Sequence, residues 1–190
     1  MNMITSQFQE VGHDLFTRGL VSSHTGNLSI RIGDNLIITR RNSQLGFLQE
    51  QDLIETGIYK DDRFTPLAST ELAVHRAIYR TTPALAIIHA HPPYSIALSM
   101  KERKIMPGSP EGYDTIGEVP VLGWDMEVKP GGMSDIIAEA LINRRIIMVY
   151  SHGTFATGKL FEEAFNYTTT LEENYRVICL LKSQEAGKTK

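Results

Sequence analysis

Two histidines separated by one residue end a short apolar run, Ala-Leu-Ala-Ile-Ile-His-Ala-His, at positions 84–91. Because successive side chains of a β-strand alternate between faces, His89 and His91 are expected to point the same way. Their Cα atoms would lie about 6.6 Å apart in a strand. Two imidazoles can lean across that gap and share an ion at about 2.0–2.1 Å from each nitrogen. The same pattern is typical of two polar residues at the solvated end of a strand, so by itself it indicates only part of a metal site.

A third histidine and a glutamate could complete such a site. His152 follows a second apolar run, residues 146–150, at a strand-to-loop exit where functional residues often collect. If the two strands are neighbours in one sheet, three imidazoles lie at one edge, as in a catalytic zinc site with an open position. Glu71 is the fourth candidate, because it falls in the first turn of a helix predicted to begin at Ser69, where the helix dipole favours a carboxylate. A glutamate there could equally serve the helix start alone.

The elements that would position these residues follow from periodicity and from turn signals. Apolar spacing and helix-start residues predict helices over residues 4–20, 69–82, 92–100, 134–143 and 160–182. Alternating or continuous apolar runs predict strands over residues 27–32, 36–39, 84–91, 119–122 and 146–150, with short strands within 53–59. Residues 107–117, rich in Gly and Pro, are predicted to form a long loop. Because tight turns as well as helices separate the strands, we expect one α/β domain over residues 1–190, with a mixed sheet covered by helices.

Composition argues against several classes of protein. The net charge is −3 and no basic cluster occurs along the chain, so we expect no nucleic-acid partner. The first residues lack the basic segment and apolar core of a signal peptide, and no run approaches the ~18 apolar residues of a membrane helix. The single cysteine, Cys179, excludes an internal disulfide and fits a reducing compartment. We therefore expect a cytoplasmic protein without a membrane partner, in which Cys179 is buried and inert.

Several short segments resemble, in order, those of the class II aldolase/adducin family. They are Gly-Asn-Leu-Ser at 26–29, Ile-Thr at 38–39, Ser-Thr-Glu at 69–71, His-Ala-His at 89–91, His-Gly at 152–153 and the start of the last helix at 161–164. The resemblance implies a three-layer α/β/α sandwich with a central mixed, largely antiparallel sheet. It also implies a homotetramer with its active site at the subunit interface.

The resemblance gives each candidate residue a role. It implies that His89, His91 and His152 hold a zinc ion, although imidazole also suits other divalent transition metals. It implies that Glu71 is the catalytic acid/base and ligates the metal when substrate is absent. Tyr113, in the predicted loop, stands roughly where the family places a tyrosine that protonates the alkoxide, but an exposed loop aromatic explains it equally well.

The resemblance also implies a phosphate site at Gly26 and Asn27, at a pair after the second strand, and at the hydroxyl residues Ser69 and Thr70. Hydroxyls and free helix N–H groups make an anion site without net charge. At the pair after the second strand this chain has Arg41 and Asn42 where the family usually has Thr-Gly or Ser-Gly. A guanidinium there could clamp a phosphate or a substrate carboxylate, or it could face solvent. The exact substrate is therefore open.

Taken together, the resemblance implies a zinc-dependent aldolase of carbohydrate metabolism. Such an enzyme cleaves a phosphorylated ketose, such as L-fuculose 1-phosphate, into dihydroxyacetone phosphate and an aldehyde through a metal-stabilised enediolate. The same scaffold supports sugar-phosphate epimerases, dehydratases and decarboxylases, because a fold does not fix a reaction. A non-catalytic, adducin-like interaction module and a purely structural zinc site are the remaining alternatives.

Overall fold

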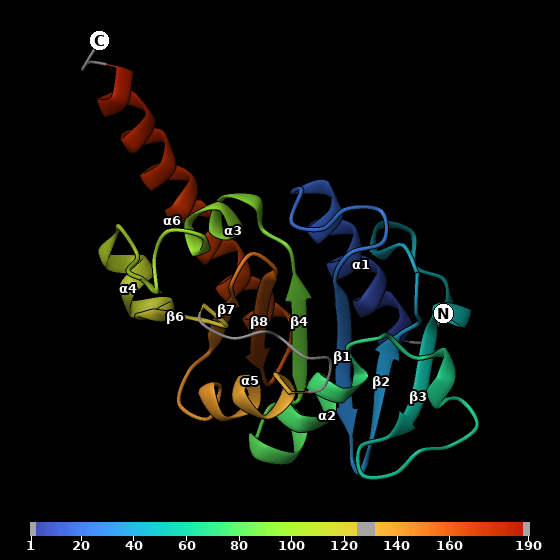
Figure 1. The fold of residues 1–190 in the computed structure, drawn as a ribbon. Coiled ribbons are helices and arrows are strands. Elements are labelled where there is room, and N and C mark those ends of the chain that lie inside the picture. Colours follow the sequence, from blue (N-terminus) through green and yellow to red (C-terminus); the bar gives the residue numbers. More distant parts are fainter. Residues whose placement is uncertain (1–2, 125–131, 188–190) are drawn as a thin grey trace.

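The computed structural model describes residues 3–124 and 132–187, and its centre is a sheet of eight strands (Figure 1). The strands lie in the order β3-β2-β1-β4-β8-β7-β6-β5. Their bounds are β1 Asn27–Ile32, β2 Asn35–Thr39, β3 Leu53–Gly57, β4 Ala86–Ala90, β5 Lys104–Ile105, β6 Val119–Leu122, β7 Ile146–Val149 and β8 Gly153–Gly158. Every neighbouring pair is antiparallel except β6 and β7, which are parallel. The predicted mixed, largely antiparallel sheet is confirmed.

Helices cover both faces of this sheet (Figure 1). They are α1 Met3–Thr17, α2 Leu72–Thr81, α3 Pro93–Ser99, α4 Pro110–Ile116, α5 Ser134–Ala140 and α6 Phe161–Gly187. One hydrophobic cluster joins the sheet to α1, α3, α4 and α6, and the other joins it to α2 and α5. Along β4, Ile88 and Ala90 belong to the first cluster and Ile87 to the second, so His89 points to the side of α2 and α5. The three-layer α/β/α sandwich is therefore confirmed.

Two local predictions are wrong, and both bear on the site. Residues 110–116, predicted as loop, form α4, because the Ser109 hydroxyl accepts a hydrogen bond from the Gly112 N–H and Pro110 occupies the first helical position. Strand β8 was not predicted, since its short run between two glycines carries few large apolar residues. It lies between β4 and β7, so the two strands that end in histidine are not neighbours.

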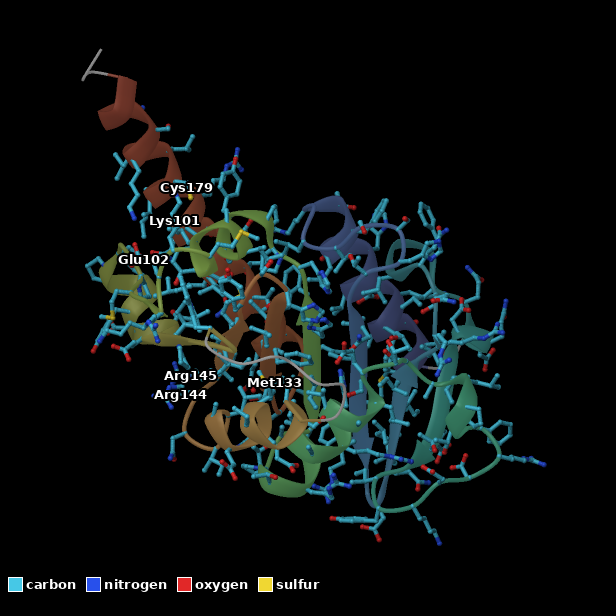
Figure 2. All side chains as sticks on the ribbon, in the orientation of Figure 1. Lys101, Glu102, Met133, Arg144, Arg145 and Cys179 are labelled. Carbon is cyan, nitrogen blue, oxygen red and sulfur yellow. The ribbon has the colours of Figure 1, made fainter. Side chains whose placement is uncertain are left out.

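Two further differences concern helices. Helix α2 begins at Leu72, with Glu71 as its N-cap residue, whereas the helix was predicted to begin at Ser69. Helix α5 ends at Ala140, three residues before the end of the predicted helix. Cys179 is half-buried on α6, near Lys101, rather than buried (Figure 2). Burial still raises the pKa of its thiol, which keeps the sulfur in its less reactive protonated form. Among the helices of residues 3–124 and 132–187, none is both long and apolar enough to cross a bilayer.

Candidate metal centre and substrate pocket

The three histidines meet at one end of the central strands. His89 is on β4, His91 follows it, and His152 lies in the turn between β7 and β8. Each offers one ring nitrogen to a group whose members lie within 4.8 Å of one another. The Nε2 atoms of His89 and His91 are 3.0 Å apart, close to the ~3.3 Å expected for two ligands of one tetrahedral zinc ion.

The strand that was not predicted is what brings His152 to the other two histidines. β8 pairs with β4 so that Thr154 lies opposite Ala90, and the tight turn before β8 then carries His152 to the end of β4. Gly153 makes this approach possible. A Cβ at this position would overlap the carbonyl oxygen of Ala90 and lie 3.1 Å from Cε1 of His89. A side chain at position 153 would therefore push the imidazoles apart.

The orientation of His89 is fixed from two sides. Its Nδ1 lies 2.9 Å from the carbonyl oxygen of Thr154, which can only accept, so Nδ1 donates and Nε2 keeps its lone pair. The ring also stacks on Phe155, with ring centroids 4.2 Å apart and planes inclined by 15°. A backbone acceptor on the far nitrogen is the usual arrangement for a metal-binding histidine.

Burial favours the neutral form of His89 and His91, which is the form that binds a metal. It lowers the pKa of His89 well below its usual value, and the neighbouring His91 and His152 add to the shift. Burial, and then His152, lowers the pKa of His91 to about 4. Three imidazoles that converge on one point fit a divalent transition metal, zinc among them, with at least one coordination position left for a ligand.

Glu71 lies beside this trio and not within it. Its Oε1 is 3.8 Å from Nε2 of His152, and 28% of its side chain is exposed. The Ser69 hydroxyl accepts a hydrogen bond from the Glu71 N–H at 3.2 Å, so the serine holds the backbone while the carboxylate is left free of the helix start. A carboxylate so placed can exchange a proton with a ligand bound at the histidines.

A cavity of about 190 Å³ joins the trio to the predicted phosphate residues. Its lining contains every candidate residue from the sequence except Tyr113, together with four that the sequence analysis did not single out. The lining residues are His24, Thr25, Gly26, Asn27, Arg40, Arg41, Asn42, Ser43, Ser69, Thr70, Glu71, His89, His91 and His152. A larger hollow of about 860 Å³ beside β3 contains none of them.

Backbone contacts bring the separate segments of this cavity together. The chain after β2 runs beside the segment before α2: Arg40 forms a β-bridge with Ala68, and the Arg41 N–H donates to the Leu67 carbonyl at 3.0 Å. Asn42 has φ 61°, a left-handed conformation that Asn tolerates better than most residues. The departure from a Thr-Gly pair at 41–42 therefore replaces the threonine side chain but keeps a residue suited to this backbone.

The sequence and the fold are similar to those of known proteins. Residues 6–179 match the model of the class II aldolase and adducin N-terminal domain. The chain belongs to the class II aldolase and adducin family. It is 28% identical over 187 residues to the 3-oxo-tetronate 4-phosphate decarboxylase of Escherichia coli K12, covering 94% of this chain and 87% of that protein. It is 29% identical over 169 residues to the L-fuculose phosphate aldolase of Methanococcus maripaludis, covering 87% and 91%.

Solved structures of the family agree with the fold. The crystal structure of L-fuculose-1-phosphate aldolase from Thermus thermophilus superposes with a TM-score of 0.89 at 33% identity and covers 96% of each chain. The relatives therefore include both aldolases and decarboxylases. The class II aldolases of the family are metal-dependent, and the relatives named above act on phosphorylated compounds. The histidine trio of this chain is where such a metal fits.

Two residues differ from what the sequence predicts for this cavity: Arg40 lines it without having been singled out, and Tyr113 lies outside it. Arg40 joins Arg41 in the cavity lining, and neither guanidinium has a side-chain partner among the described residues. Nothing in the spacing of the sequence distinguishes Arg40 from a surface arginine. Tyr113 lies on α4 with 54% of the residue exposed, and it does not line the cavity of its own chain.

Burial of the histidines predicts how the stability of the metal-free protein depends on pH. Burial lowers the pKa of His75 to about 3, whereas an unfolded histidine takes up a proton near 6.5. The unfolded state therefore binds more protons below about pH 6.5, and the free energy of unfolding falls as the pH falls. His75 alone should contribute about 1.4 kcal/mol per pH unit between roughly pH 6 and 4.

Urea unfolding of the metal-free protein at several pH values measures this slope. His75→Gln should reduce the slope, and His13→Gln, at an exposed position of α1, should leave it unchanged. A free energy of unfolding that stays level from pH 7 to 5 would contradict the neutral, buried state of these rings.

Proposed function

We propose that this protein is a metal-dependent aldolase, a lyase that cleaves a phosphorylated ketose resembling L-fuculose 1-phosphate into dihydroxyacetone phosphate and an aldehyde. The observation that carries the proposal is the single cavity in which three imidazoles, the carboxylate of Glu71 and a set of phosphate-type donors meet. Zinc is the proposed metal, since three histidines with an open position are a common catalytic zinc site. When bound, the metal would supply Lewis-acid stabilisation of negative charge on the substrate oxygens.

The residues of the chain divide the remaining work. His89, His91 and His152 would hold the metal, while Gly26, Asn27, Asn42, Ser69 and Thr70 would bind the phosphate through N–H and O–H donors. Cleavage breaks the bond between C3 and C4 and leaves the electron pair on the dihydroxyacetone phosphate half. Glu71 would then donate a proton to that carbon, and in the synthetic direction it would remove it.

The oxygen at C4 must lose a proton during cleavage and regain it during synthesis. We propose that the Tyr113 hydroxyl exchanges this proton. Because Tyr113 does not line the cavity of its own chain, we propose that it acts across a subunit boundary in a homotetramer. The family resemblance supports this assembly. We also propose a cytoplasmic location, which the single cysteine supports.

A sugar-acid phosphate decarboxylase is the second candidate, and the two unpartnered arginines favour it. Arg40 and Arg41 place two positive charges in a cavity that contains one carboxylate, Glu71. A substrate that carries a carboxylate as well as a phosphate would use both guanidiniums. Loss of CO₂ from a 3-oxo acid leaves an enolate, and the same Glu71 could protonate it. An epimerase or a dehydratase of the same scaffold is a weaker alternative, and an adducin-like module needs neither the histidines nor the arginines.

A screen of the metal-loaded protein separates these activities. Phosphorylated ketoses and phosphorylated 3-oxo sugar acids are offered in turn, and the products are identified by mass spectrometry. We expect dihydroxyacetone phosphate and an aldehyde from a ketose phosphate. Release of CO₂ from the acids, with no cleavage of the ketoses, would establish the second candidate instead. Formation of an isomer without free aldehyde would indicate an epimerase, and no turnover of any compound would contradict the proposal.

The variant Arg41→Gln tests whether the Arg41 guanidinium binds a carboxylate of the substrate. If the substrate carries a carboxylate, we expect its KM to rise about tenfold or more, because a hydrogen-bonded charge is lost. Arg144→Gln is the control, since Arg144 is exposed and does not line the cavity (Figure 2). An unchanged KM for every substrate would show that Arg41 faces solvent during turnover.

A further inference from the structure

We propose that His75, with Ser29 and Tyr79, forms a buried hydrogen-bond relay that positions the side-chain amide of Asn27 as a donor for the substrate phosphate. This proposal rests on the phosphate site of the proposed function and adds three residues that do not line the cavity. His75 is accordingly a positioning residue, since it acts through Asn27.

The relay is continuous and fully enclosed. The Tyr79 hydroxyl lies 2.7 Å from Oγ of Ser29, Oγ lies 2.6 Å from Nδ1 of His75, and Nε2 of His75 lies 2.6 Å from Oδ1 of Asn27. All four side chains are buried, with 5% or less of each residue exposed. Residues 27 and 29 share one face of β1, and residues 75 and 79 are one turn apart on α2, so two elements supply two members each.

The donor and acceptor capacities of the four side chains indicate in which direction the hydrogen bonds of the relay run. A neutral imidazole has one donor and one acceptor, and burial keeps His75 neutral because it lowers the pKa to about 3. Since Oδ1 of Asn27 can only accept, Nε2 of His75 donates to it and Nδ1 accepts. The Ser29 hydroxyl must therefore donate to Nδ1, and its oxygen accepts from the Tyr79 hydroxyl. Every hydrogen along the chain then has an acceptor.

The reverse direction leaves a group unsatisfied. It would rotate the Asn27 amide so that its nitrogen faces His75, make Nδ1 of His75 donate to Ser29, and make Ser29 donate to Tyr79. The Tyr79 hydroxyl would then have to donate elsewhere, and no other acceptor for it occurs among the described residues. A buried hydroxyl without an acceptor is unfavourable, so the burial of Tyr79 selects the first direction.

The consequence appears in the cavity, which Asn27 lines. With Oδ1 held by His75, the Nδ2 group has no partner among the described residues and can donate to a ligand. An amide free to rotate would present its oxygen to the ligand for part of the time, and that oxygen repels an anion. The Asn27 amide can in principle donate or accept a hydrogen bond. The relay fixes it as a donor toward the cavity, which suits a phosphate because phosphate oxygens accept hydrogen bonds.

Two measurements on the metal-loaded, full-length protein test the relay. Nitrogen-15 NMR of the imidazoles should show Nε2 of His75 protonated and Nδ1 bare. Titration with inorganic phosphate should show that Ser29→Ala weakens phosphate binding about tenfold and Tyr79→Phe about threefold, the range expected when a hydrogen bond to an anion is lost or partly lost. Tyr175→Phe is the matched control, because its hydroxyl is also buried but has no partner in the described structure. It should bind phosphate as the wild type does.

A double variant separates positioning from general loosening of the fold. Ser29→Ala should cause no further loss of phosphate affinity once Asn27→Ala is present, since the relay acts through Asn27. Metal content should be the same in all variants. If Ser29→Ala does not fold, Tyr79→Phe carries the test, because it removes one atom from the far end of the relay.

The outcomes are distinct. A protonated Nδ1 on His75 in the wild type, or phosphate affinity in both Ser29→Ala and Tyr79→Phe equal to that of Tyr175→Phe, would overturn the relay and leave the phosphate site in place. A wild type that binds no phosphate, or an Asn27→Ala variant with undiminished affinity, would instead overturn the phosphate site of the proposed function and the relay with it.

Discussion

Glu71→Gln is expected to abolish proton exchange between dihydroxyacetone phosphate and solvent while leaving the metal content nearly unchanged. Glutamine keeps the size and polarity of the side chain but cannot take up or release a proton at neutral pH. The three imidazoles converge without Glu71, so the metal should remain bound. A loss of about 10²–10⁴-fold in exchange rate is typical for removal of a general acid or base.

Deuterium uptake into dihydroxyacetone phosphate, followed by NMR, measures this exchange, and elemental analysis gives the metal content of the same sample. Glu139→Gln provides the control, because Glu139 lies exposed on α5 and outside the cavity. Exchange at the rate of the wild type in Glu71→Gln would remove Glu71 from the catalytic role. Loss of metal along with exchange would instead indicate that the carboxylate is a ligand.

The second large effect is expected from His89→Ala, which should lose the metal and all metal-dependent activity. His89 is the buried member of the trio, and its orientation is set by Thr154 and Phe155, so alanine removes a ligand nitrogen that the fold holds in place. Removing a partner that only orients a metal ligand typically costs 10–100-fold in metal affinity, so we expect a loss of more than about 100-fold for the ligand itself.

Competition with a chromophoric chelator measures the affinity of the variant for zinc. His13→Ala, on the exposed face of α1, should bind zinc as tightly as the wild type. Retention of one zinc ion per chain by His89→Ala after dialysis against the chelator would mean that the metal is bound at another place.

The parts of the fold that the sequence predicts are those with a strong apolar period. The run at 84–91 specifies a buried strand that ends in two histidines, and the structure has β4 there, with both rings directed to one point. The predicted strand at 27–32 is also present, as β1, and Gly26 precedes it with φ 79°, where its missing Cβ leaves room for the carbonyl oxygen of His89.

The features that the sequence did not predict depend on contacts between segments that are far apart in the chain. β8 lies between two other strands, yet apart from Phe155 it consists of small and polar residues, and periodicity alone does not detect such a segment. The place of Arg40 in the cavity lining depends on the bridge between position 40 and Ala68, which links segments 28 residues apart. The relay from Tyr79 to Asn27 likewise requires α2 to lie against β1, and no local pattern reports that contact.

X-ray absorption spectroscopy of the zinc-loaded protein tests the central claim most directly, because it reports the atoms bound to the metal. We predict imidazole nitrogens at about 2.0–2.1 Å, three per zinc ion, and one or two further light-atom ligands. His13→Ala should give the same spectrum, whereas His89→Ala, which binds zinc only when the ion is in large excess, should show fewer imidazole ligands on any zinc that it retains. A zinc shell without histidine, or one that the loss of His89 does not alter, would contradict a metal site at His89, His91 and His152.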